Sequence, residues 1–559
     1  MIKLNKKQLA ARVEEITVLL TNELSVVETT GELNVVTKAH EILAELDYYQ
    51  KNPQDLRFVA VPNDQLGRKS VVCILRGNKG NSKKTVILNG HLDTVGISDY
   101  GALADLAHKP YELTKKFNEI KNTLPTEVRT DLASNNYLFG RGIFDMKAGN
   151  AINIALIEAI AADLDNFEGN IIYAGVCDEE ANSAGMLSVV PELVKIRNEN
   201  HFEYLGFIDT DYMSTHYEND QNKYVYIGSV GKLMPSFFIV GKETHVGEAF
   251  NGLDANQIAA SITNKINMNV DFCDVVDGEV TLPPVTLRMR DLKPEYSVQT
   301  AQTTSLFFNY ATHVSTPAEV MAKMLNAAQE AFELTVEKIN QQYQKYCQIA
   351  KLPHQRLPWK ARTISYEQLY QAVKAEKAEK GEQLDAEIAA YAAELLQDPT
   401  VDARDFALKQ VEFIHKQSAD REPVVIVYFS PPYYPHIHVS GETTMEQNII
   451  KATQEAVNKT NTPYQIVYKK FFPYIADLSY AAAPSDEKVI ATLKNNIPGF
   501  GVKYDLPLAE MADLNLPVLN IGPFGKDAHQ FTERLEKNYS FKVVPELLYK
   551  TISNLLTTS

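Results

Sequence analysis

The stretch VILNGHLDTVG, Val86 to Gly96, places a histidine and a carboxylate at the point where a hydrophobic strand ends. The apolar run predicts a buried strand, and the Asn-Gly pair marks its end. Because side chains alternate along a strand, His91 and Asp93 point the same way. The pair suits a metal ligand with the carboxylate that orients it. It also suits a turn with two solvated polar side chains, so this stretch alone leaves both interpretations open.

The composition narrows the class of protein. A length of 559 residues predicts two or three domains, and 45% hydrophobic with 23% charged residues is ordinary for a globular protein. A net charge of −16 offers no basic face to nucleic acid. No apolar run is long enough to span a membrane, and the charged N-terminal segment is typical of an amphipathic helix, not a secretion signal. The four scattered cysteines fit reduced thiols, so we expect a cytoplasmic location.

The first two hundred residues alternate between helical and strand patterns. Besides the strand near Val86, we expect strands over 70–77, 169–180 and 202–211. We expect a helix over 150–164. Such alternation predicts an α/β layer with ligands at the ends of its strands.

From Gly228 the pattern changes to β-α-β-β-α-β, which predicts a small domain with one sheet and two helices. Its expected elements are 231–241, 253–266, 280–290, 303–314, 315–339 and 423–434. A polar helical insertion covers 351–422, and the α/β pattern resumes near residue 437. We therefore predict a first domain in two parts, 1–224 and 437–559, with an inserted domain over 225–436.

Polar groups collect at the predicted strand ends and in the late GPFGKDAHQFTE stretch. They are His91, Asp93, Asp145, Glu179, Glu180, Asp209 and His529. Each has an ordinary explanation alone, such as a helix cap, a solvated helix start or a surface histidine. Together, carboxylates crowded at one sheet edge repel one another unless cations lie among them. Two zinc ions with mixed histidine and carboxylate ligands would balance that charge, leaving one carboxylate free as a general base.

Five motifs occur in order: GHLDTV, GRGIFDMKAG, DEEANSAG, the strand-end acid Asp209 and GPFGKDAHQFTE. This series resembles the zinc-dependent amidohydrolase and peptidase family of aminoacylase, carboxypeptidase G and succinyl-diaminopimelate desuccinylase. The resemblance implies a catalytic domain with a mixed central sheet flanked by helices, plus an inserted α+β lid and dimerisation domain. It covers the chain except for the loop around 98–135 and the helical insertion. The length and the extra helices are most similar to the branch linked to arginine utilisation.

The resemblance also implies a ligand set for two zinc ions, with cobalt or manganese as substitutes. His91 and Asp209 would hold one ion, and Asp211 is the alternative to Asp209. Glu180 and His529 would hold the other ion.

A bridging acid would join the two ions, and the resemblance assigns that role to Asp145. It also implies a cis peptide bond between Asp145 and Met146. Asp93 would orient the first histidine ligand, and Glu179 would be the general base that later returns the proton to the leaving amine.

The inserted domain carries GKETHVGEAFNGLDAN, residues 241–256, which resembles the family stretch whose histidine stabilises the oxyanion, commonly across a dimer interface. That histidine is His245; the alternative is an edge-strand histidine in a loop. One position departs from the family, because Ala311 stands where relatives often have an arginine that clamps a substrate carboxylate. Arg288 or Arg290 replaces that arginine, or both lie on a solvated strand face.

We therefore predict a cytoplasmic two-zinc hydrolase that cleaves an amide bond of a small N-acyl amino acid or short peptide in amino-acid (arginine) catabolism. A homodimer through the inserted domain is expected, and nucleic-acid, membrane and further cofactor partners are not. Two alternatives stay open: a catalytically altered family member that binds or regulates, and an exopeptidase that acts on free N-termini.

Overall fold

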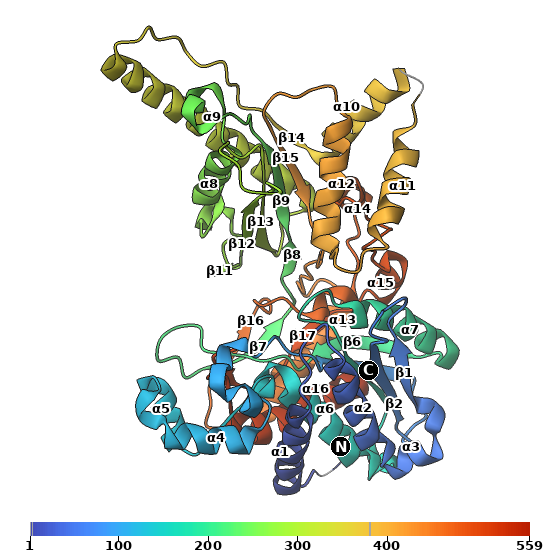
Figure 1. Cartoon of the computed structure of the whole chain (residues 1–559). Coiled ribbons are helices and arrows are strands. Elements are labelled where there is room, and N and C mark those ends of the chain that lie inside the picture. Colours follow the sequence, from blue (N-terminus) through green and yellow to red (C-terminus); the bar gives the residue numbers. More distant parts are fainter. Residues whose placement is uncertain (1, 3, 380–381, 559) are drawn as a thin grey trace. The chain divides into compact units, whose positions relative to one another are not determined.

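The computed structural model describes residues 2, 4–379 and 382–558 (Figure 1). Its contacts divide the chain into two compact units. Unit 1 comprises Met1–Ser229, Ile437–Ala483 and Pro507–Ser559, and unit 2 comprises Val230–His436 and Pro484–Leu506. The predicted division differs at Pro484–Leu506, which it assigns to the last part of the first domain. The sequence of this segment predicts an amphipathic helix, but it does not indicate which unit the helix packs on. The predicted domain boundaries stay a prediction.

Unit 1 contains an eight-stranded mixed sheet in the order β1-β2-β5-β3-β6-β17-β7-β16. The strands are β1 (Leu56–Ala60), β2 (Lys69–Arg76), β3 (Lys84–His91), β5 (Asn170–Val176), β6 (Glu203–Asp209), β7 (Lys223–Ile227), β16 (Ile466–Lys469) and β17 (Val518–Asn520). β3 runs parallel to β5 and β6, whereas β2 pairs antiparallel with β1 and β5. A small sheet joins β4 (Tyr137–Phe139), β18 (Gly525–Lys526) and β19 (Arg534–Glu536). The central strands are nearly continuous apolar runs, as expected for strands buried on both faces.

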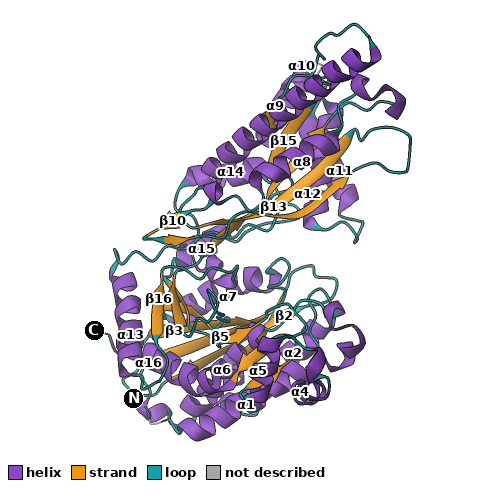
Figure 2. Cartoon of the chain, turned by 90° about the vertical axis from the view of Figure 1, so that its left-hand side faces the viewer, coloured by secondary structure: helices purple, strands orange, loops and turns teal. Residues whose placement is uncertain are grey.

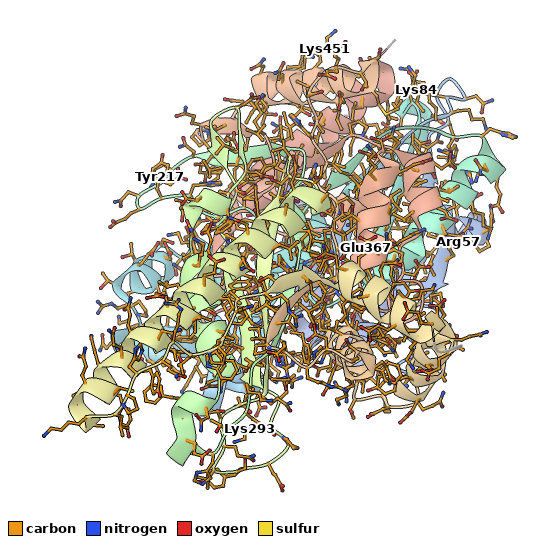
Figure 3. All side chains as sticks on the ribbon, turned by 90° about the horizontal axis from the view of Figure 1, so that it is seen from above. Arg57, Lys84, Tyr217, Lys293, Glu367 and Lys451 are labelled. Carbon is orange, nitrogen blue, oxygen red and sulfur yellow. The ribbon has the colours of Figure 1, made fainter. Side chains whose placement is uncertain are left out.

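Ten helices of unit 1 are described. They are α1 (Lys6–Asn22), α2 (Gly31–Ala44), α3 (Asp47–Lys51), α4 (Pro110–Glu119), α5 (Thr126–Ala133), α6 (Ala148–Ala161), α7 (Ala184–Asn200), α13 (Thr444–Lys459), α15 (Leu508–Leu514) and α16 (Val544–Thr557). Figure 2 shows α6 and α7 on opposite sides of the strands. Arg57 of β1, labelled in Figure 3, pairs with Glu192 of α7 at 2.8 Å. Lys84, labelled in the same view, is the first residue of β3 and donates a hydrogen bond to the carbonyl of Thr558, just after α16. The first residue of β3 thus lies beside the end of α16, and its last residue is His91.

Unit 2 confirms the β-α-β-β-α-β prediction. Its strands are β8 (Gly231–Leu233), β9 (Pro235–Val240), β12 (Val285–Asp291), β13 (Thr303–Thr312), β14 (Thr363–Ser365) and β15 (Val424–Phe429), beside a hairpin of β10 (Val275–Val276) and β11 (Glu279–Val280). Its helices are α8 (Ala255–Ile266), α9 (Pro317–Ala350), α10 (Tyr366–Glu379), α11 (Leu384–Leu395), α12 (Ala403–Gln417) and α14 (Glu487–Asn496). The strand expected over 280–290 begins only at Val285, because Pro283 and Pro284 cannot donate to a ladder.

The helical insertion supplies part of the unit 2 core. Phe238 and Val240 of β9 pack in one cluster with Val373 of α10 and with Val411 and Ile414 of α12. Residues of the other parity on β9, among them Phe237, are also buried. The insertion therefore covers one face of this sheet. Among the described residues, no helix combines the length and the apolar character that crossing a membrane requires.

Candidate metal centre

The predicted site residues other than His245 gather where three neighbouring strands of unit 1 end. β3 lies between β5 and β6 and is parallel to both, so the carboxyl ends of all three strands lie at one edge of the sheet. His91 is the last residue of β3 and is paired in register with Val176, the last residue of β5. The loop with Glu179 and Glu180 therefore begins beside His91. Sites of α/β proteins form at such strand ends.

His91 is buried and surrounded by carboxylates. Its Nε2 lies 3.2 Å from Asp145 Oδ1 and 3.9 Å from Glu179 Oε2. Its Nδ1 lies 3.1 Å from the Asp93 backbone carbonyl and 3.8 Å from Asp93 Oδ1. Burial lowers the pKa of His91, but the hydrogen bond with Asp145 and the charges of Glu179 and Asp93 outweigh burial and raise the pKa well above its usual value. The ring is thus oriented on its Nδ1 side, and its Nε2 faces the acids.

Asp145 connects two histidines that are far apart in sequence. One carboxylate oxygen lies 3.2 Å from His91 Nε2, and the other lies 3.0 Å from His529 Nε2. Burial raises the pKa of Asp145, but the hydrogen bonds with both histidines outweigh it and hold the pKa well below its usual value. The peptide bond between Asp145 and Met146 is cis, as the resemblance implies. His529 Nε2 also lies 3.1 Å from Glu180 Oε1.

Two groups of described residues bring metal-ligating atoms within 4.8 Å of one another. The buried group consists of His91, Asp145 and Asp211, and the outer group consists of Asp145, Glu180 and His529. Each group combines an imidazole nitrogen with carboxylate oxygens, a donor set typical of zinc and of other divalent transition metals. Asp145 belongs to both groups. This donor set and the crowding of buried acids fit a pair of cations.

Asp211 belongs to the buried group of described residues and Asp209 to neither group, so the geometry favours the alternative ligand Asp211, and the choice between the two acids stays a prediction. The register explains why the geometry favours Asp211. Asn89 of β3 pairs with Asp209 of β6, so the chain after β6 reaches the level of His91 only at residue 211. Asp209 instead accepts the backbone N–H of Thr210 at 2.8 Å. Burial raises the pKa of Asp209 to about 7.

Asp93 and Glu179 lie beside the two groups of described residues and belong to neither. Asp93 is completely buried, and its two carboxylate oxygens accept the backbone N–H groups of Glu179 at 3.2 Å and Glu180 at 3.0 Å. Glu179 belongs to neither metal-ligating group of the described residues, although it lies close to His91. Burial raises the pKa of Glu179 well above its usual value, against the opposing charge of His91.

The outer group depends on a loop after β17. His529 has a φ of +62°, and its side chain is 46% exposed. Burial lowers its pKa, but the hydrogen bonds with Asp145 and Glu180 raise it to about 11. Four residues on, Glu533 is buried and pairs with Arg141 at 2.8 Å. This pair connects the His529 loop to the segment that leads to Asp145.

The histidine candidate and the two arginine candidates of the inserted domain lie in unit 2. His245 caps the short helical turn Val246–Asn251, where its Nδ1 accepts the backbone N–H of Gly247 at 3.1 Å, and it is exposed. Arg290 and Arg288 pair with Asp405 of α12 at 2.6 and 3.5 Å. The roles expected for these three residues in catalysis or substrate binding stay predictions.

An aromatic pair that was not predicted from the sequence lies beside the buried group. The rings of Tyr212 and Tyr474 stack at 4.9 Å, and Phe144 meets Tyr212 edge-on, also at 4.9 Å. Tyr212 follows Asp211 directly, and Phe144 precedes Asp145. An aromatic residue next to each acid was the signal in the sequence, but only the fold brings the rings together.

A buried histidine, a more exposed one and several acids converge at the end of a mixed sheet, and together they define a class: this chain is a metal-dependent hydrolase of peptide and amide bonds. The model of peptidase family M20/M25/M40 matches residues 87–498, and the chain belongs to that family. It is 34% identical over 556 residues to protein RocB of Bacillus subtilis (strain 168), covering 99% of this chain and 96% of that protein. It is 35% identical over 549 residues to protein YqjN of the same strain, covering 98% and 97%.

Solved structures agree with the fold. A tripeptidase from Staphylococcus aureus superimposes with a TM-score of 0.52 at 11% identity, covering 98% of this chain and 99% of that one. An M20 metallo-carboxypeptidase from Sulfolobus solfataricus gives a TM-score of 0.50 at 10% identity, covering 97% and 99%. At such low identity the likeness concerns the fold alone.

Proposed function

We propose that this protein is a two-zinc hydrolase that cleaves the amide bond of a small N-acyl amino acid or short peptide. The observation that carries the proposal is Asp145, whose two carboxylate oxygens face one histidine each, as a bridging ligand requires. The place in amino-acid (arginine) catabolism rests on the resemblance to the arginine-utilisation branch.

In this proposal His91 and Asp211 hold one ion, Glu180 and His529 hold the other, and Asp145 lies between them. The chemistry that zinc supplies when bound is polarisation of the scissile carbonyl and activation of water. Cobalt or manganese would suit the same donors.

Glu179 is the proposed general base. It takes a proton from the attacking water and returns it to the nitrogen of the leaving amine. Support comes from its position close to His91, nearly buried and outside both metal-ligating groups of the described residues. Asp93 holds Glu179 by accepting its backbone N–H, and in the proposal His245 donates a hydrogen bond to the oxyanion.

We also propose that the protein forms a homodimer through unit 2. β12 is an edge strand of the unit 2 sheet, and its side chains Val285, Leu287 and Met289 are 39%, 51% and 45% exposed. An edge strand with a row of exposed apolar side chains is suited to pairing with a second copy. Light scattering of wild type and Met289→Lys tests this: a dimer that becomes monomeric supports the proposal, and a wild-type monomer at micromolar concentration contradicts it.

The first experiment on function measures metal content and turnover together. Wild type, Glu179→Gln and the control Glu168→Gln, two residues before β5, are analysed for metals and assayed on N-acyl amino acids and dipeptides that include arginine derivatives. Two zinc ions per chain, with turnover lost only in Glu179→Gln while the metal stays, supports the proposal. A metal-free protein contradicts the ligand set, and bound metal without turnover favours a binding or regulatory protein. Cleavage only of substrates with a free N-terminus favours an exopeptidase.

A further inference from the structure

A buried arginine lies behind the loop that carries Glu179 and Glu180. Arg68 directly precedes β2, is 9% exposed and forms ion pairs with three carboxylates. It pairs with Asp64 at 2.8 Å, with Glu32 of α2 at 3.3 Å and, at closer range, with Asp178. Asp178 is completely buried and is the residue before Glu179.

Asp178 is the point at which this loop is fixed. Its φ is +65°, which is rare for a residue with a side chain, so the chain changes direction there. Its backbone N–H donates to Glu32 Oε2 at 2.8 Å, and its own Oδ2 accepts the backbone N–H of Ala184 at 3.0 Å, where α7 begins. Arg68 thus contacts both the side chain of Asp178 and the carboxylate that holds its backbone.

The next two residues are fixed from the opposite direction. The backbone N–H groups of Glu179 and Glu180 both donate to Asp93, the acid two residues after His91. Three consecutive backbone N–H groups therefore end on two carboxylates, Glu32 and Asp93. The hydrogen bonds to Asp93 are expected, because Asp93 lies beside the proposed metal ligand His91. The contacts that Arg68 and Glu32 make with Asp178 involve none of the predicted site residues.

We propose that Arg68 and Glu32 are positioning residues that hold the turn at Asp178, and through it the general base Glu179 and the ligand Glu180. This inference rests on the proposed function for the roles of the two glutamates. The geometry has a direct consequence: without the guanidinium, the buried Glu32 and Asp178 and the partly buried Asp64 lose their shared cation, and the turn loses the contact that sets its direction. Residues that orient ligands in this way typically change metal affinity or activity by about 10–100-fold.

The opposite end of the same strand offers a matched control. Arg76, the last residue of β2, makes a two-bond ion pair with Asp55, at 3.0 and 2.8 Å. Arg76→Met and Arg68→Met each remove an arginine–carboxylate pair from β2, but only Arg68→Met touches the turn. Arg68→Lys keeps the charge and loses the fork that reaches two acids at once.

The test combines three measurements on the full-length protein: amide hydrogen exchange of the peptide that covers 176–184, zinc affinity by competition with a chelator, and kcat with KM. We expect Arg68→Met to speed exchange at the Glu179 and Glu180 amides, to weaken zinc binding about 10–100-fold and to lower kcat by a similar factor with KM changed less than about threefold. Arg68→Lys should lie between Arg68→Met and wild type, and Arg76→Met should match wild type in all three measurements.

Unchanged exchange in Arg68→Met, or equal exchange in Arg68→Met and Arg76→Met, overturns the inference whatever the activity is. Faster exchange without any change in zinc affinity or kcat also overturns it, since the turn then positions nothing. If Arg68→Met does not fold, Glu32→Gln replaces it, because this substitution keeps the shape and weakens the acceptor of the Asp178 N–H. If Glu179→Gln keeps full activity while Arg68→Met shows faster exchange and weaker zinc binding, the general-base assignment fails and the positioning of Glu180 stands.

Discussion

The buried and outer metal-ligating groups share Asp145 and differ in how the chain builds them. In the buried group, His91 is 3% exposed and stands on a central strand, and Asp211 follows the neighbouring strand. In the outer group, His529 is 46% exposed and stands on a loop with a left-handed backbone. Strand pairing fixes the first group, whereas the second depends on side chains that hold a loop.

Two buried arginines brace that loop. Arg141 pairs with Glu533 at 2.8 Å, and Arg534 pairs with Asp131 at 2.7 Å and with Asp527. Both arginines are almost completely buried. In the buried group, hydrogen-bonded strands hold the side chains in place, whereas in the outer group ion pairs do so. The two groups should therefore respond differently to mutation, chelation and pH.

The largest effect on zinc content and activity is expected at Asp145, the residue that both groups share. Asp145→Asn removes one charge from both groups, so the zinc content should fall from two ions per chain toward none, and kcat/KM should fall about 10³-fold or more, because several kcal/mol of charge stabilisation is lost. Elemental analysis and hydrolysis assays measure both quantities. A variant that retains two ions would show that Asp145 does not bridge.

The next effect separates the two groups. His529→Gln should leave one zinc ion per chain, whereas His91→Gln should leave the other. In wild type, a chelator should remove the two ions in two phases, the faster phase from the outer group, because its histidine is open to solvent. Metal release followed with a colorimetric chelator checks this. A single phase in wild type that stays unchanged in His529→Gln contradicts the distinction.

A third prediction sharpens the composition of the buried group. Asp211→Asn should lower the affinity for one zinc ion about 10–100-fold. Asp209→Asn should change zinc affinity less than about threefold, because Asp209 accepts a hydrogen bond from Thr210 and belongs to neither group of described residues. Chelator competition on the two variants measures the difference. Equal losses in both would return the ligand role to the residue preferred from sequence.

The smallest effect concerns the brace of the outer loop. Burial raises the pKa of Glu533 to about 7, against the opposing charge of Arg141. Between the usual glutamate pKa and 7, the native metal-free protein binds more protons than the unfolded chain, so Glu533 lowers stability as the pH rises through this window. Glu533→Gln does not titrate, so its stability relative to wild type should improve by about 1–3 kcal/mol from pH 5 to pH 8. Denaturant unfolding of the chelated proteins tests this, and a pH-independent difference contradicts it.

The sequence was informative where function depends on regular strands. The apolar runs located β3, β5 and β6, and the polar residues at the ends of β3 and β5 led to His91 and Glu180, whereas Asp145 lies between β4 and α6 and was found from the GRGIFDMKAG motif. Asp209 was preferred to Asp211 from the sequence, because the register between β3 and β6, which brings residue 211 to the level of His91, is not visible in a single strand.

The long-range ion pairs could not be predicted from the sequence either. Arg68 and Glu32 are separated by 36 residues, and Arg141 and Glu533 by 392 residues, so no local pattern connects them. For the same reason the helical insertion was recognised as helical, but its packing on β9 through Phe238 and Val240 was not.

The assignment of Pro484–Leu506 to unit 2 has a consequence for dissecting the molecule. The polypeptide passes between the two units four times, after residues 229, 436, 483 and 506, whereas a simple insertion passes twice. A fragment of residues 230–436 would lack α14, whose Asn495 and Asn496 bond to Glu367 at the start of α10 and whose Val489 and Leu493 are buried. Separate expression of unit 2 therefore requires a splice that restores residues 484–506, and the remaining chain requires two new joints instead of one.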